Sequence, residues 1–257
     1  MMDRRIGAQY YTLRDFAKTI EDFEETCRKV KEIGYKIIQI SGTPLKAADM
    51  RPIIDKYGLE VVTSHRNFDD FKNNLDEIIE YNKTLGCKLC GVGSMPQEYW
   101  QSEEDLTRFI QEVNEMAAKL KEQGMLFGYH NHAFEFGKRG DKRIMDRLIA
   151  ETDPENVMFI VDTFWLQFGG VNPAAFIRKL GKRAMAIHFK DYNLKLENWG
   201  VAEIAEVGEG NLDWDDIIAA CDEAGAKWAL VEQDTCNRDP FESMKMSYDY
   251  LVEKGFC

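Results

Sequence analysis

The side chains best suited to chemistry stand at the ends of short apolar segments. The chain has four histidines among its 257 residues. All four fall in the windows VVTSHRN (61–67), GYHNHAFEF (128–136) and AIHFKD (186–191), as His65, His130, His132 and His188. Two further windows, FIVDTFW (159–165) and ALVEQD (229–234), contain Asp162 and Glu232. Imidazoles and carboxylates that converge on one point can bind a divalent metal ion, so the pattern predicts a metal-dependent site.

Strand periodicity indicates which of these side chains point the same way, because alternate residues of a strand share a face. In the segment 184–190, His188 and Lys190 follow two alanines on one face, whereas Met185 and Phe189 belong to a bulky opposite face. We expect the bulky face to pack under helices and the other face to point into a central mouth. The same alternation places Glu232 on one face with Leu230 and Asp234.

Each of these residues also has a structural interpretation. A lone histidine can bond a backbone carbonyl, as we consider for His65. Asp162 can cap the segment that follows it, and Glu232 can pair with a neighbouring cation. Charged side chains are rarely buried without a partner, however, and these all follow apolar segments. Taken together, the set therefore favours a functional site.

Short apolar segments alternate with helical patterns along the whole chain. The helix predicted at 103–123 is the clearest, because its apolar residues recur at the three-and-four spacing of one helix face. Gly124 and Gly225 stand where a helical pattern ends and a strand begins. The predicted strands are 6–11, 36–40, 60–64, 88–93, 126–130, 158–162, 184–190 and 229–233, and the predicted helices are 19–33, 46–57, 71–85, 103–123, 141–151, 173–180, 213–224 and 241–254.

Eight such units in 257 residues predict an α/β fold, a single-domain (β/α)8 TIM barrel over residues 1–257. The main rival is a doubly wound open sheet, which often carries a glycine-rich phosphate loop after its first strand. Here that position reads QYYTLRD, with no glycine. In a barrel the strand ends meet at one rim, which would bring the windows named above together.

Composition excludes several classes of protein. The net charge of −12 argues against a nucleic-acid surface and against docking on an anionic membrane. No apolar run is long enough for a membrane helix, and the start has no apolar signal-peptide core, so we expect a cytoplasmic protein. Cys87 and Cys90 form a C-x-x-C, but nothing completes a zinc set, and we interpret both as buried structural thiols. The sequence leaves open whether the protein forms a homo-oligomer.

The ordered motifs resemble the sugar phosphate isomerase/epimerase family of the xylose isomerase-like TIM barrel superfamily. The resemblance covers essentially the whole chain and rests on IGAQYYTLRD (6–15), GYHNHAFEF (128–136), VDTFW (161–165), IHFKD (187–191), EVGEGNLDW (206–214) and VEQD (231–234). It implies one bound divalent ion, Mn²⁺ in the first place, with Mg²⁺, Co²⁺ or Zn²⁺ as alternatives. The ligands it implies are Glu135, Asp162, His188 and Glu232.

The first of those ligands has competitors. Glu135 is the family-like carboxylate, but it lies five residues past His130. In sugar epimerases the ligating glutamate stands at the strand tip itself. His130 or His132 could therefore take that coordination place, which would leave Glu135 to bind substrate.

The resemblance also implies the reaction. A small carbohydrate, a keto sugar or cyclic keto polyol, would lose the proton next to its carbonyl group, and the metal would stabilise the resulting enediolate. His132 or Glu232 would act as the base, while His130 and Lys190 would orient hydroxyl groups or supply an acid. The side chains expected to bind substrate are His65, Trp165 and Tyr11.

Several outcomes share that intermediate. Return of the proton gives an isomerase or epimerase, the leading hypothesis, whereas loss of a neighbouring group gives an inosose dehydratase-like enzyme or a 3-keto-glycoside lyase. An apurinic endonuclease of the same superfamily, with three zinc ions, fits poorly with four histidines and a charge of −12. The non-enzymatic alternative is a metal-containing sugar-binding protein or partner subunit.

Overall fold

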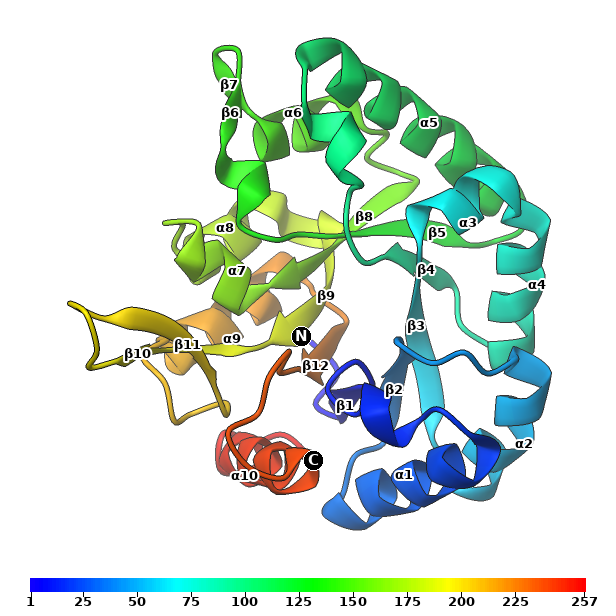
Figure 1. Ribbon diagram of the computed structural model, residues 1–257, viewed down its shortest axis with the longest axis vertical. Helices are drawn as coiled ribbons and strands as arrows, with labels where there is room; N and C mark the ends of the chain where they lie inside the picture. Colours follow the sequence, from blue (N-terminus) through cyan, green and yellow to red (C-terminus); the bar gives the residue numbers. More distant parts are fainter.

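Eight parallel strands close into a barrel in the computed structural model, which describes residues 1–257 (Figure 1). Around the barrel they follow the order β1-β12-β9-β8-β5-β4-β3-β2, which confirms the predicted single-domain (β/α)8 fold. The barrel strands are β1 (Ile6–Gln9), β2 (Ile37–Ile40), β3 (Glu60–Arg66), β4 (Leu89–Val92), β5 (Leu126–His130), β8 (Val157–Asp162), β9 (Ala184–Phe189) and β12 (Trp228–Val231).

Helices connect the strands and cover the outside of the barrel (Figure 1). Local sequence sets their ends: the Ser102 hydroxyl accepts a hydrogen bond from the Asp105 N–H at the start of α5, and Gly225 ends α9 in the left-handed conformation. The helices are α1 (Ile20–Ile33), α2 (Ala47–Lys56), α3 (Phe68–Asn73), α4 (Leu75–Leu85), α5 (Glu103–Glu122), α6 (Ile144–Glu151), α7 (Thr163–Phe168), α8 (Pro173–Leu180), α9 (Trp214–Ala224) and α10 (Pro240–Glu253). None of them is both long enough and apolar enough to cross a membrane.

Two antiparallel hairpins interrupt the regular alternation, and the sequence pattern did not predict them. One pairs β10 (Asp191–Lys195) with β11 (Val201–Ala205) and protrudes from the barrel at the left of Figure 1. The other pairs β6 (Lys138–Arg139) with β7 (Lys142–Arg143). Buried Asp191 holds the base of the larger hairpin, because its carboxylate accepts hydrogen bonds from the backbone of the 208–212 loop and from Trp214 Nε1 at 2.6 Å.

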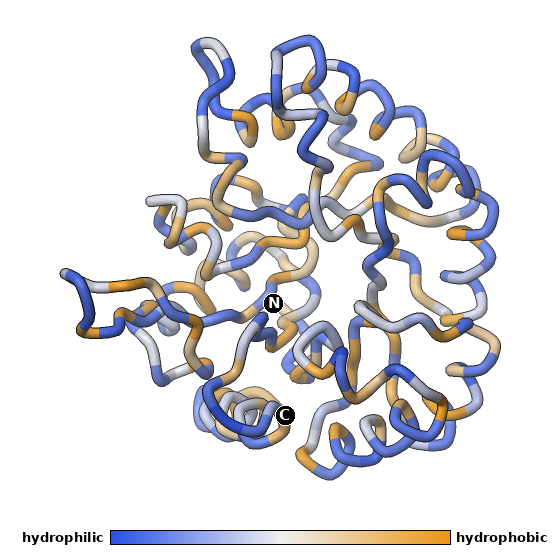
Figure 2. The backbone as a smooth tube through the Cα atoms, viewed as in Figure 1, coloured by the Kyte–Doolittle hydropathy of each residue, from blue (hydrophilic) through white to orange (hydrophobic).

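Apolar side chains pack in two separate layers. A cluster of 65 buried residues fills the space between strands and helices, and Figure 2 shows the apolar positions recurring along these elements. A second cluster fills the inside of the barrel below the rim. Gly7 makes room for it, since a Cβ there would lie 2.3 Å from Leu230 Cδ2. The inner cluster consists of Ile37, Val62, Leu89, Ile160, Met185, Ala186 and Leu230.

One predicted orientation is wrong. Met185 was expected to pack under the helices, but it belongs to the inner cluster. The pairing of β8 with β9 shifts register there, from Phe159 opposite Ala184 to Ile160 opposite Ala186, so that Met185 is an extra residue and breaks the alternation.

The C-x-x-C pair is structural, as interpreted from the sequence. Cys87 and Cys90 are both buried and free. The Cys87 thiol donates a hydrogen bond to Asn82 Oδ1 at 2.9 Å, and burial raises the pKa of this thiol to about 12. A thiol that stays protonated is a poor metal ligand and a poor nucleophile.

Candidate active site

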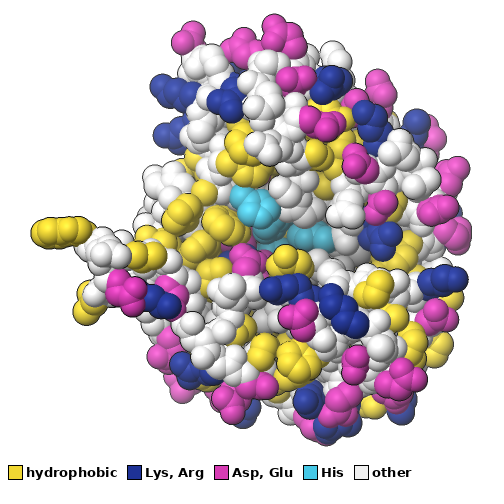
Figure 3. All heavy atoms as spheres, viewed as in Figure 1, with side chains coloured by type: hydrophobic (Ala, Val, Ile, Leu, Met, Phe, Trp, Pro, Cys, Tyr) yellow, Lys and Arg dark blue, Asp and Glu magenta, His cyan; other side chains and the backbone are white.

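Three of the four predicted ligands, Asp162, His188 and Glu232, meet at the carboxyl ends of the strands, together with His130. His130 ends β5, Asp162 ends β8, His188 lies in β9 and Glu232 directly follows β12. All four side chains are buried. One ligand atom from each, a ring nitrogen or a carboxylate oxygen, lies within 4.8 Å of the other three. Histidine side chains are visible in the central hollow of Figure 3. This arrangement can hold a metal ion, and two imidazoles with two carboxylates suit a divalent cation.

Hydrogen bonds from outside the cluster fix which nitrogen of each imidazole faces it. His188 Nε2 lies 2.9 Å from Gln39 Oε1, and His130 Nδ1 lies 3.0 Å from the Gly93 carbonyl oxygen. Both partners are oxygen acceptors, so these two ring nitrogens carry the proton. The other nitrogen of His188, Nδ1, then faces the cluster with a lone pair, as metal-ligating histidines do. Nε2 of His130 lies 3.4 Å from Asp162 Oδ2, and against the effect of burial this carboxylate raises the pKa of His130.

The contact between His188 and Glu232 indicates that the cluster suits a cation. His188 Nδ1 lies 2.7 Å from Glu232 Oε2 and makes no hydrogen bond, and the Lys190 ammonium lies 3.0 Å from the same carboxylate oxygen. Burial lowers the pKa of His188 in spite of the nearby carboxylate, and the positive charge of Lys190 holds the pKa of Glu232 well below its usual range against the effect of burial. Two lone pairs at this distance repel unless they share a cation, so the donor set fits a bound metal.

Lys190 supplies one positive charge to the same cluster. Its Nζ lies 2.7 Å from Asp162 Oδ2, 3.0 Å from Glu232 Oε2 and 3.1 Å from Asp234 Oδ1. Burial alone would lower the pKa of Lys190, but these carboxylates raise it, and Lys190 in turn lowers the pKa of Asp162. Three carboxylates and one ammonium leave a net charge of −2, which a divalent cation would neutralise.

Glu135 does not join the cluster. It lies in the short 3-10 helix η3 (Phe134–Phe136), where its Oε1 accepts a hydrogen bond from the Tyr129 hydroxyl at 2.8 Å and its Oε2 from the His132 N–H at 2.9 Å. Burial raises the pKa of Glu135 to about 7. The structure therefore places the alternative residue, His130, beside Asp162, His188 and Glu232, and Glu135 supports the turn that carries His132.

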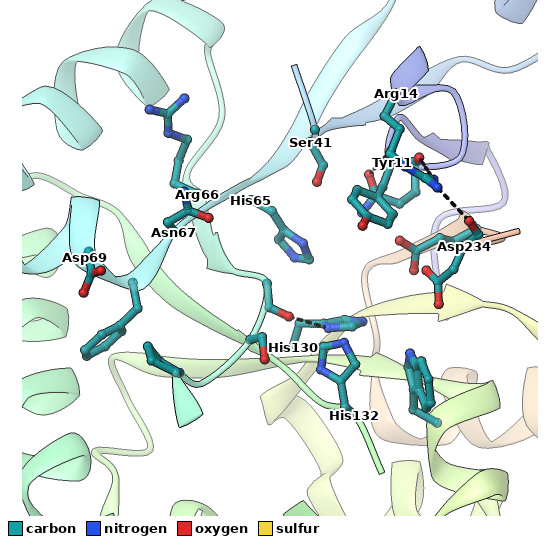
Figure 4. A pocket seen from close by; sticks show the side chains of 18 of the residues that line it. Tyr11, Arg14, Ser41, His65, Arg66, Asn67, Asp69, His130, His132 and Asp234 are labelled. Carbon is teal, nitrogen blue, oxygen red and sulfur yellow. Dashed lines mark hydrogen bonds between the residues drawn. The ribbon is translucent and has the colours of Figure 1, made fainter. Parts of the chain in front are cut away.

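The other predicted site residues line a cavity of about 830 Å³ above the cluster. His65 and His132 face each other across it from β3 and from the segment after β5 (Figure 4). His132 Nδ1 has no partner, and burial lowers the pKa of His132 to about 3, so its ring is neutral. Trp165 lies beside it, with ring centres 5.2 Å apart, whereas Tyr11 is half-exposed at the rim.

Amide side chains at the rim were missed by the sequence reasoning. Gln39 lies in β2, one residue before its end, and fixes the tautomer of His188. Gln9 ends β1 and lines the cavity with an unpaired Nε2, and Asn131 Oδ1 accepts a hydrogen bond from the Asp162 N–H at 3.0 Å. The signal that could have found the two glutamines is the same one that marked the histidines: a polar residue at the end of an apolar strand.

The fold and this rim define the class of protein to which the chain belongs. A sequence model of the xylose isomerase-like TIM barrel matches residues 27–252, and the chain is a member of that family. The resemblance inferred from the motifs is thereby confirmed.

Individual relatives fall into two groups. The chain is 30% identical to an inosose dehydratase of Geobacillus thermodenitrificans over 169 residues, which is 59% of this chain and 55% of the relative. It is 24% identical to the inosose dehydratase of Geobacillus kaustophilus over 89% of this chain and 86% of the relative. A crystal structure of a sugar phosphate isomerase/epimerase from Parabacteroides distasonis superimposes with a TM-score of 0.77 at 25% identity, covering 97% of this chain and 98% of that one. The first of these relatives is thus matched over little more than half its own length.

Proposed function

We propose that this protein removes the proton next to the carbonyl group of a keto sugar or cyclic keto polyol and then expels a substituent from the neighbouring carbon. The observation that carries the proposal is the neutral, unpaired Nδ1 of His132 above a buried set of four donors. His130, Asp162, His188 and Glu232 would hold a divalent cation, Mn²⁺ or another ion of that size. Bound there, the cation supplies a Lewis acid for the negative charge that develops on the carbonyl oxygen.

The chain's own residues account for the proton movements. His132 Nδ1 accepts the α-proton, and the electron pair of the C–H bond passes into the enolate. As the enolate collapses, the bond to the β-oxygen breaks and its electron pair stays on that oxygen, which takes the proton back from His132 and departs as water or an alcohol. Lys190 stays charged and fully buried among three carboxylates, and its N–H groups hold Asp162 and Glu232 in place. The Trp165 ring beside His132 would contact the sugar's C–H face.

Isomerisation or epimerisation is the second candidate, and one observation favours it. His65 Nε2 is also buried without a partner, and burial lowers the pKa of His65 well below its usual range. A second neutral imidazole on the opposite wall could return the proton to the other face of the intermediate. The names of the curated relatives favour elimination, and the name of the Parabacteroides neighbour favours this alternative.

The test is solvent deuterium exchange with the metal-loaded protein and a panel of ketoses and inososes, followed by NMR. We expect one C–H position to exchange and, for the true substrate class, water to be lost. Glu232→Gln should abolish turnover and weaken metal binding with the fold intact, because it removes one of the four buried donors of the cluster. The control is Glu115→Gln, an exposed carboxylate on α5. Full activity of Glu232→Gln, or activity undiminished by exhaustive metal removal, would refute the proposal, and a pure sugar-binding protein would show no exchange.

A further inference from the structure

A second hollow opens from the active-site cavity, between α7 and the β10–β11 hairpin. It has a volume of about 450 Å³, and Trp165, Asp234 and Thr235 line both it and the active-site cavity. The two differ sharply in chemistry. Only 3 of the 19 residues around the active-site cavity are hydrophobic, whereas 6 of the 11 around the second hollow are. We call this second hollow the hairpin groove.

Aromatic rings form one wall of the hairpin groove. Phe164 and Phe168 stack with their ring centres 5.9 Å apart and an angle of 9° between their planes, and Trp165 meets Phe168 edge-on at 5.7 Å. Val201 and Ile204 of β11 also line the groove. Phe168 is 53% exposed and Val201 is 45% exposed, so the groove leaves large apolar side chains open to water (Figure 3). An apolar patch of this kind beside a polar cavity indicates a binding surface.

We propose that the hairpin groove binds a planar apolar substituent of the substrate, an aromatic aglycone linked through oxygen to the keto sugar in the polar cavity. This inference rests on the proposed function. The sugar ring matches the hydroxyl-binding side chains of the cavity, and the aglycone matches the aromatic wall that begins at Trp165. A free monosaccharide would leave that wall in contact with water. The substrate class is therefore a keto-glycoside with an aryl or similar leaving group.

The geometry places the leaving group where elimination needs it. Trp165 lines both the active-site cavity and the hairpin groove. The bond between sugar and aglycone would therefore lie next to Trp165, which is beside His132. Removal of the α-proton forms the enolate, and the C–O bond to the aglycone then breaks with its electron pair on oxygen. That oxygen takes the proton from His132, which yields a phenol or alcohol and an unsaturated keto sugar. No oxidant or reductant is consumed.

The test compares binding of phenyl β-D-glucopyranoside with that of methyl β-D-glucopyranoside, neither of which has the keto group needed to react, to the metal-loaded full chain by calorimetry. We expect the phenyl glycoside to bind about tenfold more tightly, because burial of an aromatic ring is worth at least that factor. Phe168→Ser should bring the ratio to about one. The matched control is Leu196→Ser, which removes a fully exposed apolar side chain from the same hairpin but outside the groove.

Equal binding of the two glycosides, or no binding of either, overturns the inference even where deuterium exchange with free keto sugars succeeds. A phenyl preference that Phe168→Ser removes supports it, and absence of exchange in that case refutes the proposed reaction alone. The groove could instead be covered by a second copy of the chain. In that case light scattering would show a change in the oligomeric mass of Phe168→Ser, while the ratio of the phenyl and methyl glycoside affinities would stay unchanged. This result would overturn the inference.

Discussion

Two layers inside the barrel, built by the same strands, differ in almost every physical property. The lower layer is apolar and complete, with seven side chains packed against one another. The upper layer is buried as deeply but carries three carboxylates, one ammonium and two imidazoles. The two layers are separated by one step of the strand alternation: Ile160 and Asp162 on β8, Ala186 and His188 on β9, Leu230 and Glu232 at the end of β12.

The difference shows where stability and function reside. Lower-layer side chains need only shape, and their burial stabilises the barrel. Upper-layer atoms depend on partners from other strands, and several have none: His132 Nδ1, Trp165 Nε1 and Gln9 Nε2 are buried without hydrogen bonds. Buried unpaired polar groups cost free energy unless a ligand satisfies them. The upper layer is therefore built to be completed by a cation and a substrate, and the predictions below separate the two layers.

The largest effect on stability is expected in the lower layer. Leu230→Ala should lower the free energy of unfolding by about 2–5 kcal/mol, because it removes a fully buried side chain from a layer that Gly7 keeps closely packed. Urea denaturation measures the change, and Val252→Ala on the exposed side of α10 is the control. Calorimetry should find metal affinity within about threefold of the wild type. A large loss of metal binding would show that the two layers are coupled.

A pH-dependent effect of similar size is expected from Glu135, behind the upper layer. Burial raises the pKa of this carboxyl from 4.5 to about 7, so the folded state holds a proton that the unfolded state releases. The stabilisation is fully present below the unfolded pKa and is lost as pH rises through the folded pKa. Between about pH 4.5 and about pH 8 the loss should reach about 3 kcal/mol.

The measurement is the free energy of unfolding of wild type and Glu135→Gln across that pH range. The difference between the two should fall as pH rises, because glutamine has no proton to release. A matched exchange at an exposed site, Glu115→Gln, should show no such slope. Parallel pH profiles for wild type and Glu135→Gln would contradict the prediction. They would show that burial does not raise the pKa of Glu135.

The sequence was sufficient for the barrel and for most of the upper layer, for one physical reason. Parallel strands in a barrel all end at the same rim, so residues at strand ends meet in space even when they are distant in the chain. His188, Lys190 and Glu232 were found this way, and so was Asp162. Their contacts in the structure follow directly from that rule.

The rule fails where the backbone leaves the strand geometry. Glu135 was preferred over His130 as a ligand, but β5 ends at His130 and the chain turns into a 3-10 helix, so alternation no longer predicts where Glu135 points. Met185 is displaced by the register shift between β8 and β9. The β10–β11 hairpin is a long insertion after β9 that carries no signal in the strand-helix alternation. Each of these features is fixed by contacts with other elements rather than by local pattern.

The smallest expected effect tests how the upper layer depends on a neighbouring strand. Gln39→Leu removes the acceptor that holds the proton on His188 Nε2, so the Nδ1 lone pair is no longer fixed toward the cluster. Loss of such a partner typically weakens metal binding about 10–100-fold, which calorimetric titration with Mn²⁺ would measure. Gln9→Leu is the matched control, because it removes the same side chain from the end of the adjacent strand, where the amide oxygen accepts from the Tyr11 N–H and has no contact with a ligand. Equal metal affinity in the two variants would mean that His188 keeps its tautomer without Gln39, and the Glu232 carboxylate alone would then have to orient the ring.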